Sequence, residues 1–220
     1  MSKFVEAIDQ IQNALAPLLK EQAFKKKGRT YNKKINNDVT NVINFQMGQY
    51  QIGPLSPLPE LRDDKYGQFT VNLGVYLPAI TELERTAAKQ NIVQEYDCQI
   101  RQRLSALAHE GRDIWWDLHA NPEAIANEIR NFLNLYGFPF FGRFSNYQKI
   151  ISHFKQHGDL PFNTKGRSQL VSGLIFIKRG DRDNAANLFQ QVYDGSLNHP
   201  FHKYVKSVSE KVGLTVTDRK

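Results

Sequence analysis

The sequence contains a single cysteine, Cys98, in 220 residues. One thiol excludes an internal disulfide and a zinc site built from several cysteines, so Cys98 is expected to be a small core residue. Long apolar runs are also missing: no window approaches the roughly 18 consecutive apolar residues that a membrane span needs. The N-terminus carries charges where a signal peptide would be apolar. We therefore expect a cytoplasmic protein without a membrane segment.

Familiar catalytic motifs are scarce as well. The sequence has no glycine-rich phosphate loop of either standard type and no Gly-x-Ser-x-Gly elbow. His153 and His157 are spaced to share one helix face, but without a neighbouring carboxylate ligand they are better interpreted as surface histidines. Arg-Gly-Asp at Arg179 to Asp181 is typical of a helix end followed by an N-cap. The sequence thus predicts no catalytic residue, no metal site and no cofactor.

Positive charge is in excess, with a formal net charge of +7 and a pI near 9.4. Clustered lysines and arginines neutralise phosphates, so this composition is compatible with nucleic-acid binding. A basic turn between a helix and a strand is, however, most often a solvated connection. The excess is concentrated in one basic patch, formed by Lys25, Lys26, Lys27, Arg29, Lys33 and Lys34.

Two stretches alternate apolar and polar residues with the period of a half-buried antiparallel strand, residues 39–47 and 68–77. In the second stretch, Phe69, Leu73 and Val75 share the face that should be buried. Further strands are expected over residues 29–34, 98–105 and 113–118, with a turn at residues 36–38.

Helical periodicity flanks these strands. Residues 2–22 predict an amphipathic helix that Pro17 should kink or restart, and a capping box predicts a short helix over 82–90. Asn121-Pro122-Glu123 is a strong helix start, and Gly137 is expected to end that helix. The two long helices should lie on the same face of the sheet. The predicted fold class is α+β, an antiparallel sheet with helices on one face.

Beyond residue 140 the pattern becomes wholly helical, with four helices expected near residues 147–154, 170–177, 185–192 and 201–208. The second and third resemble one tetratricopeptide-type helix pair, with Gly173 and Phe189 near that repeat's small and aromatic positions. A single unit cannot form a solenoid, so it should pack back on the rest. We expect an α+β domain over residues 1–140 and a helical C-terminal region over 141–220.

The outward face of the predicted sheet carries the densest group of amides, arginines and aromatic residues. Arg103 and Trp115 are of the residue types that dominate binding hot spots, and Asp113 and Asp117 should lie alongside. This group is either a recognition surface or the ordinary wet face of an antiparallel sheet. The partner-binding candidates are Asn44, Gln46, Asn72, Tyr76, Arg101, Arg103 and Trp115.

The connection over residues 48–67 is much longer than a hairpin needs and contains three prolines. Connections of this length are either functional or merely packed on the sheet. The prolines should keep it from adding a strand to the middle of the sheet.

Four segments in order carry a family resemblance: Phe24-Lys-Lys-Lys-Gly-Arg-Thr-Tyr31, Val42-Ile-Asn-Phe-Gln46, Phe69-Thr-Val-Asn-Leu-Gly74 and Asp113-Ile-Trp-Trp116. Together they resemble the bacterial domain family catalogued as domain of unknown function 4304, over roughly residues 1–139. The resemblance implies a helix-plus-antiparallel-sheet fold in bacteria and supplies no activity or catalytic residues. Ala23 stands where glycine is expected, which affects only the local turn.

The first functional hypothesis is a non-enzymatic protein-binding module, for example a bacterial toxin-immunity protein whose partner is another protein. One alternative is a nucleic-acid-associated protein that uses the basic patch. Another is an unrecognised hydrolase or nuclease around Arg101, Arg103, Asp113 and Asp117.

Overall fold

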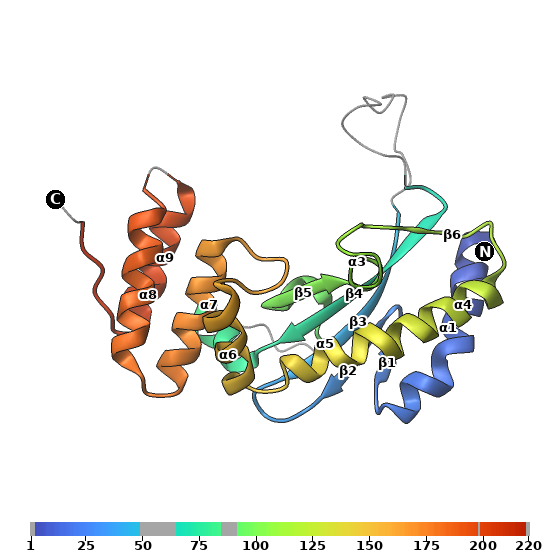
Figure 1. Cartoon of the computed structure of the whole chain (residues 1–220), viewed down its shortest axis with the longest axis horizontal. Helices are drawn as coiled ribbons and strands as arrows, with labels where there is room; N and C mark the ends of the chain where they lie inside the picture. Colours follow the sequence, from blue (N-terminus) through green and yellow to red (C-terminus); the bar gives the residue numbers. More distant parts are fainter. Residues whose placement is uncertain (1–2, 49–64, 85–91, 198, 219–220) are drawn as a thin grey trace.

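The computed structural model describes residues 3–48, 65–84, 92–197 and 199–218, and these build one antiparallel sheet with helices around it (Figure 1). The sheet has six strands in the order β1-β2-β3-β4-β5, and the short strand β6 pairs with β4 beyond the end of β5. The bounds are β1 Lys25–Lys27, β2 Thr30–Lys34, β3 Thr40–Met47, β4 Gln68–Tyr76, β5 Ile100–Arg103 and β6 Trp116–Asp117.

One face of the sheet is the core face, as the alternation predicts. Ile43 pairs with Leu73 and Phe45 with Val71, and all four side chains are buried. Helices α1 (Lys3–Glu21) and α4 (Pro122–Phe132) cover this face (Figure 1). The Asn121 side chain caps α4 by accepting from the backbone N–H groups of the first turn. The predicted α+β fold with both long helices on one face is confirmed.

Helix α1 runs through Pro17 without the restart that the sequence suggests. Proline removes one helical hydrogen bond, but Pro17 and Asn13, four residues earlier, are both exposed, so water can satisfy the freed carbonyl. The next carbonyl, that of Ala14, accepts from Arg130 Nη2 of α4, at 2.9 Å. The restart that the sequence suggests is therefore absent.

Gly137 does not end the helix that begins at Pro122. A π-helical turn over Leu133–Gly137 leads directly into α5 (Phe138–Arg143), and the Phe138 N–H bonds to the Leu133 carbonyl. Pro139 lacks an N–H, and the wider turn accommodates it. A Cβ on Gly137 would lie 3.1 Å from Leu133 and 3.4 Å from Leu104. Glycine is needed there for close packing and not as a stop.

Several other boundaries differ from expectation. Lys25–Lys27, expected as a turn, pair with β2 as a short edge strand, and β5 ends at Arg103 because the chain turns into helix α3 (Leu104–Ala108). Only Trp116–Asp117 of the strand expected over 113–118 pairs with the sheet. Helix α2 spans Pro78–Glu84, and the rest of the helix expected over 82–90 lies outside the described residues, as does most of the 48–67 connection.

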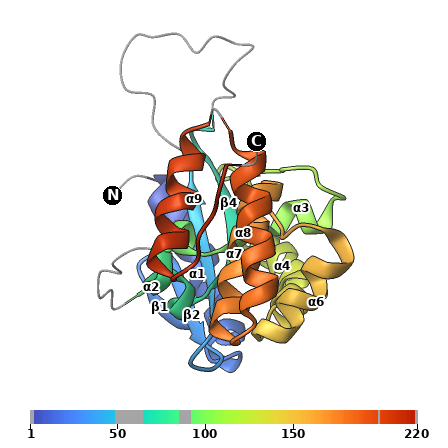
Figure 2. The same ribbon diagram turned by 90° about the vertical axis from the view of Figure 1, so that its left-hand side faces the viewer.

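The C-terminal region is helical, as expected, and packs at one end of the sheet (Figure 2). The helices are α6 Tyr147–His157, α7 Lys165–Lys178, α8 Arg182–Gly195 and α9 Pro200–Lys211. Gly173 of α7 faces the ring of Phe189 of α8, the two helices that resemble a tetratricopeptide-type pair. Asp181 caps the start of α8 and follows Gly180, which has φ 78°. The buried side chains of the C-terminal region belong to the same hydrophobic core as those of the sheet and of helices α1 and α4. No described helix is long and apolar enough to cross a membrane.

Candidate functional site on the polar face of the sheet

A short segment, residues 92–98, crosses the polar face of the sheet and is called here the crossing segment. It lies against β4 at Gly74, where a Cβ would come within 2.5 Å of the Cys98 Sγ. The Asn32 side chain of β2 holds its other end, donating to the Val93 carbonyl at 2.9 Å and accepting from the Val93 N–H at 2.7 Å. Glycine in the strand interior thus permits a close backbone approach. Cys98 is buried, as predicted, although on this face of the sheet.

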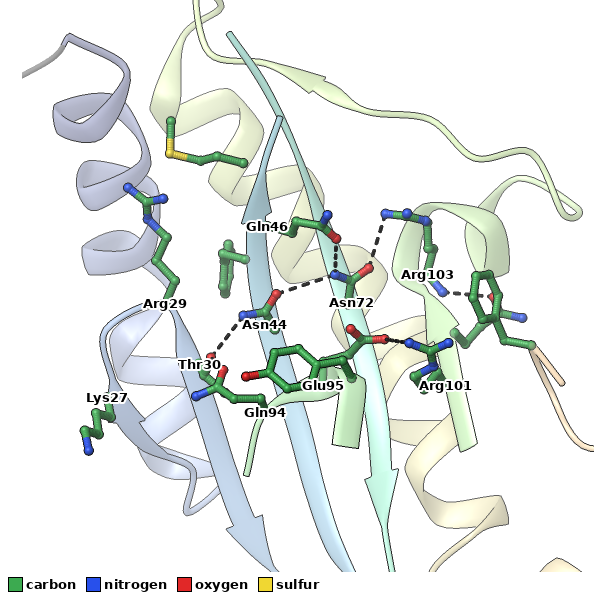
Figure 3. Close-up of a pocket in the computed structure, with 15 residues that line it drawn as sticks. Lys27, Arg29, Thr30, Asn44, Gln46, Asn72, Gln94, Glu95, Arg101 and Arg103 are labelled. Carbon is green, nitrogen blue, oxygen red and sulfur yellow. Dashed lines mark hydrogen bonds and ion pairs between the residues drawn. The ribbon is translucent and has the colours of Figure 1, made fainter. Parts of the chain in front are cut away.

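The crossing segment forms one wall of a pocket that has a volume of about 650 Å³ (Figure 3). A volume of this size is in the range of small-ligand sites and also admits protruding side chains of a protein. The strands supply its floor, and the loop before α7 supplies Phe162. The lining residues are Lys27, Arg29, Thr30, Asn44, Phe45, Gln46, Met47, Asn72, Gln94, Glu95, Tyr96, Arg101, Gln102, Arg103 and Phe162.

A row of hydrogen-bonded polar side chains forms the floor of the pocket (Figure 3). Asn44 Nδ2 donates to Thr30 Oγ1 at 3.0 Å, and Asn72 Nδ2 donates to Gln46 Oε1 at 2.8 Å. Arg103 Nη1 donates to Asn72 Oδ1 at 3.3 Å, which joins β5 to this row. Side chains that are already held by neighbours lose less conformational entropy when a ligand binds.

Positive charge dominates the lining, with Lys27 and Arg29 on one side of the pocket and Arg101 and Arg103 on the other (Figure 3). Among the described residues that line the pocket, Glu95 is the one carboxylate, and its Oε1 lies 3.5 Å from Arg101 Nη1. Burial raises the pKa of the Glu95 carboxyl, and the attraction of Arg101 and Arg103 only partly opposes that effect. The pocket therefore favours an anionic ligand.

Two exposed aromatic side chains also line the pocket. Tyr96 is 71% exposed and Phe162 is 58% exposed, and the Arg101 guanidinium lies 5.2 Å from the Phe162 ring. Phe162 has φ 58°, a left-handed conformation that costs a bulky residue about 1–3 kcal/mol. Asn163 fixes the loop by donating to the Gln99 carbonyl at 2.8 Å. An exposed, strained aromatic residue held in place beside a pocket is typical of a binding site.

Arg103 links the pocket to a second surface feature, Trp115. The Arg103 guanidinium lies 5.1 Å from the Trp115 ring, and its Nε lies 3.1 Å from Asp113 Oδ2. The Trp115 Nε1 donates to the same carboxylate oxygen at 3.3 Å. The next residue, Trp116, points the other way and is buried against Phe69. One half-exposed tryptophan is thus held in a fixed orientation beside the pocket.

The structure brings five of the seven partner-binding candidates into one pocket: Asn44, Gln46, Asn72, Arg101 and Arg103. Tyr76, at the end of β4, is half-buried and does not line the pocket, and Trp115 reaches it only through Arg103.

Strand alternation divides the basic patch between the two faces of the sheet. Lys27 and Arg29 line the pocket, whereas Lys26 lies over the Tyr31 ring and Lys33 over the Phe24 ring. The remaining two residues, Lys25 and Lys34, are exposed at the ends of the β1–β2 hairpin. Two residues of the basic patch, Lys27 and Arg29, therefore share one pocket with five of the sheet-face candidates.

The lining residues that sequence reasoning missed include Gln94, Glu95, Tyr96 and Phe162. They lie on irregular segments, where no periodicity marks them. One feature of the sequence, Gly74, could have indicated the crossing segment. An isolated glycine inside a strand pattern indicates that another backbone approaches the strand closely.

The described residues contain no group of three or more His, Cys, Asp or Glu side chains that could hold a metal ion. The rings of His153 and His157 do lie together, 4.3 Å apart. Asp117, which the hydrolase alternative would use with Asp113, instead pairs with His119 at 2.8 Å.

Residues 60–143 match the model of a family described as Domain of unknown function (DUF4304). The match confirms the resemblance seen in the sequence, although it begins at residue 60 and so leaves out β1, β2 and β3. It includes Arg101, Arg103 and Trp115 but not Lys27 or Asn44. No curated protein and no solved structure matches the chain.

Proposed function

We propose that this protein is a non-enzymatic binding module whose pocket and neighbouring Trp115 bind an acidic surface of another protein. A toxin-immunity protein, which neutralises its partner by occupying it, is the most concrete form of this proposal. The support comes from the arrangement of the side chains and their charge, since the family carries no assigned activity.

The observation that carries the proposal is the continuity from Trp115 through Arg103 into the pocket. Arginine and tryptophan are enriched among the residues that contribute most to protein interfaces, particularly where they lie beside a concave site. Arg103 is held by Asp113 and Asn72, so its guanidinium is already oriented. Excess positive charge in the pocket would select an acidic partner and accelerate association.

One observation favours a second candidate, single-stranded nucleic acid. Lys27 and Arg29 line the same pocket as the exposed rings of Tyr96 and Phe162, and such sites combine basic side chains with aromatic platforms. Nuclease treatment of the lysate distinguishes the two candidates. It abolishes the capture of nucleic acid and leaves the capture of a protein partner intact.

Affinity capture from nuclease-treated lysate of the native host tests the first candidate. We expect a defined protein to be enriched by the wild-type chain and reduced about tenfold or more by Trp115→Ala and by Arg103→Gln, because hot-spot truncations commonly have effects of that size. Tyr136→Ala and Arg179→Gln are matched controls, since both side chains are exposed and neither lines the pocket.

The melting temperature separates binding from folding. Trp115 is only half-buried, so Trp115→Ala should stay folded and melt close to wild type. Undiminished capture by both Trp115→Ala and Arg103→Gln, with intact folding, would contradict the proposal. Capture that disappears after nuclease treatment would favour the nucleic-acid candidate.

A further inference from the structure

The contact between Glu95 and Arg101 is looser than a built ion pair. Glu95 Oε1 lies 3.5 Å from Arg101 Nη1, whereas bidentate arginine–carboxylate pairs have two bonds near 2.7–2.9 Å. The Glu95 side chain is only 16% exposed, so the carboxylate has lost most of its water without gaining a close partner among the described residues. Glu95 lies on a three-residue 3₁₀ turn that no side chain caps at its N-terminus.

The surroundings of Arg101 are suited to a better carboxylate ligand. The Arg101 side chain is 34% exposed, and its guanidinium lies over the Phe162 ring and lines the pocket. Tyr96 follows Glu95 directly in the chain, and its ring is largely exposed. Both side chains line the same pocket.

We propose that Arg101 anchors a carboxylate-binding subsite, in which Glu95 holds the place of a ligand carboxylate and Tyr96 and Phe162 receive an aromatic side chain beside it. This inference rests on the proposed function and names the segment of the partner that enters the pocket: an acidic stretch with an aromatic residue next to a glutamate or aspartate. The ligand carboxylate would form the close pair with Arg101 that Glu95 does not form.

The test uses a fluorescent, end-capped hexapeptide of alternating Glu and Phe and the full-length chain, with binding measured by anisotropy. Two control peptides separate the contributions, one with Gln in place of Glu and one with Ala in place of Phe. We expect both controls to bind about tenfold more weakly or worse, since each lacks one of the two recognised groups.

Three variants assign the residues. Arg101→Gln should weaken the Glu–Phe peptide about tenfold or more, and Phe162→Ala should weaken it while leaving the Glu–Ala peptide unchanged. Glu95→Gln should tighten it several-fold, because the competing carboxylate is gone while the size of the side chain is kept. A merely structural Glu95 would give weaker or unchanged binding. Arg179→Gln and Tyr136→Ala are again the controls.

The pH dependence has a definite sign. Burial raises the pKa of Glu95, so as the pH falls Glu95 takes up a proton before the exposed glutamates of the peptide, whose ordinary pKa is about 4.3. Arg101 is then released, and wild-type affinity should rise as the pH falls. The charged groups around Glu95 are Asp97 on its own turn, Arg101 and Arg103 on β5, and Lys27 and Arg29 across the pocket. The Glu95→Gln variant should show a flat profile.

The outcomes distinguish this inference from the proposed function. Partner capture that depends on Trp115, without binding of the Glu–Phe peptide, would refute the carboxylate subsite and leave the binding module standing. Binding of an oligouridylate in preference to the peptide, lost in Arg101→Gln, would overturn the inference. Equal affinity for the Glu–Phe and Gln–Phe peptides would overturn it too.

Discussion

Gly74→Ala should dislodge the crossing segment from the sheet. The added methyl group would lie 2.5 Å from Cys98 Sγ and 3.0 Å from its Cβ, both too close for van der Waals contact. Overpacking of this kind typically costs about 1–3 kcal/mol. The replacement also removes the entropic penalty of a glycine in a strand, about 0.5–1 kcal/mol. We expect a net loss of about 1–2 kcal/mol in the free energy of unfolding.

The single thiol reports on the same event. Cys98 is 8% exposed, and burial raises its pKa well above the usual value, so native wild-type protein should react slowly with a thiol reagent. Gly74→Ala should accelerate that reaction under native conditions, because Cys98 must move away from β4. Urea unfolding and the rate of thiol modification together measure stability and local displacement.

A double-mutant cycle tests the physical cause. Cys98→Ala removes the nearer of the two clashing atoms and leaves the Cβ, so Gly74→Ala should cost less in that background than in the wild type. Gly74→Ala with wild-type stability and an unreactive thiol would refute the proposed contact. Additive losses in the cycle would show that Gly74 and Cys98 do not interact. The consequence for the site is direct, because the same segment carries Glu95 and Tyr96.

The sequence was sufficient to predict the sheet and its two faces. The apolar alternation in β4 is strict enough that Phe69, Leu73 and Val75 had only one plausible orientation, and all three are buried. Helix starts with a strong N-cap, such as Asn121, were also predicted correctly. Periodicity and capping are local signals that tertiary contacts here did not override.

Boundaries that depend on tertiary packing were not predictable from those signals. Gly137 is of the residue type that commonly ends a helix, yet it lies inside a continuous helix, where Leu133 and Leu104 approach it closely. Lys25–Lys27 carry no apolar alternation and became a strand because β2 offers an open edge.

Half of the pocket was visible in the sequence and half was not. Asn44, Gln46 and Asn72 share a strand face by alternation, so their proximity followed from the predicted sheet. Glu95 and Phe162 come from an irregular segment and a loop that are more than 60 residues apart, and only the completed fold brings them to the same pocket. Pocket residues that lie on loops cannot be predicted from the periodicity of the sequence.

Two further predictions concern stability. Ala23 follows α1 at φ 61°, and the Phe24 N–H is bonded to the Leu19 carbonyl at 2.8 Å. Ala23→Gly should raise the free energy of unfolding by about 0.5–1 kcal/mol, because glycine adopts this conformation without strain. An unchanged urea midpoint would contradict this prediction. The second concerns Glu84, whose 5% exposed side chain accepts from Arg167 Nη2 at 2.9 Å and thereby ties α2 to α7. Glu84→Gln leaves the partly buried Arg167 charge without a compensating negative charge, and with Arg167 28% exposed we expect a loss of about 1–3 kcal/mol, below the value for a fully buried pair. Adding Arg167→Met should recover part of that loss, because an apolar side chain of similar length needs no compensating charge. If the double variant is instead less stable than Glu84→Gln alone, Arg167 stabilises the helices through contacts other than this ion pair.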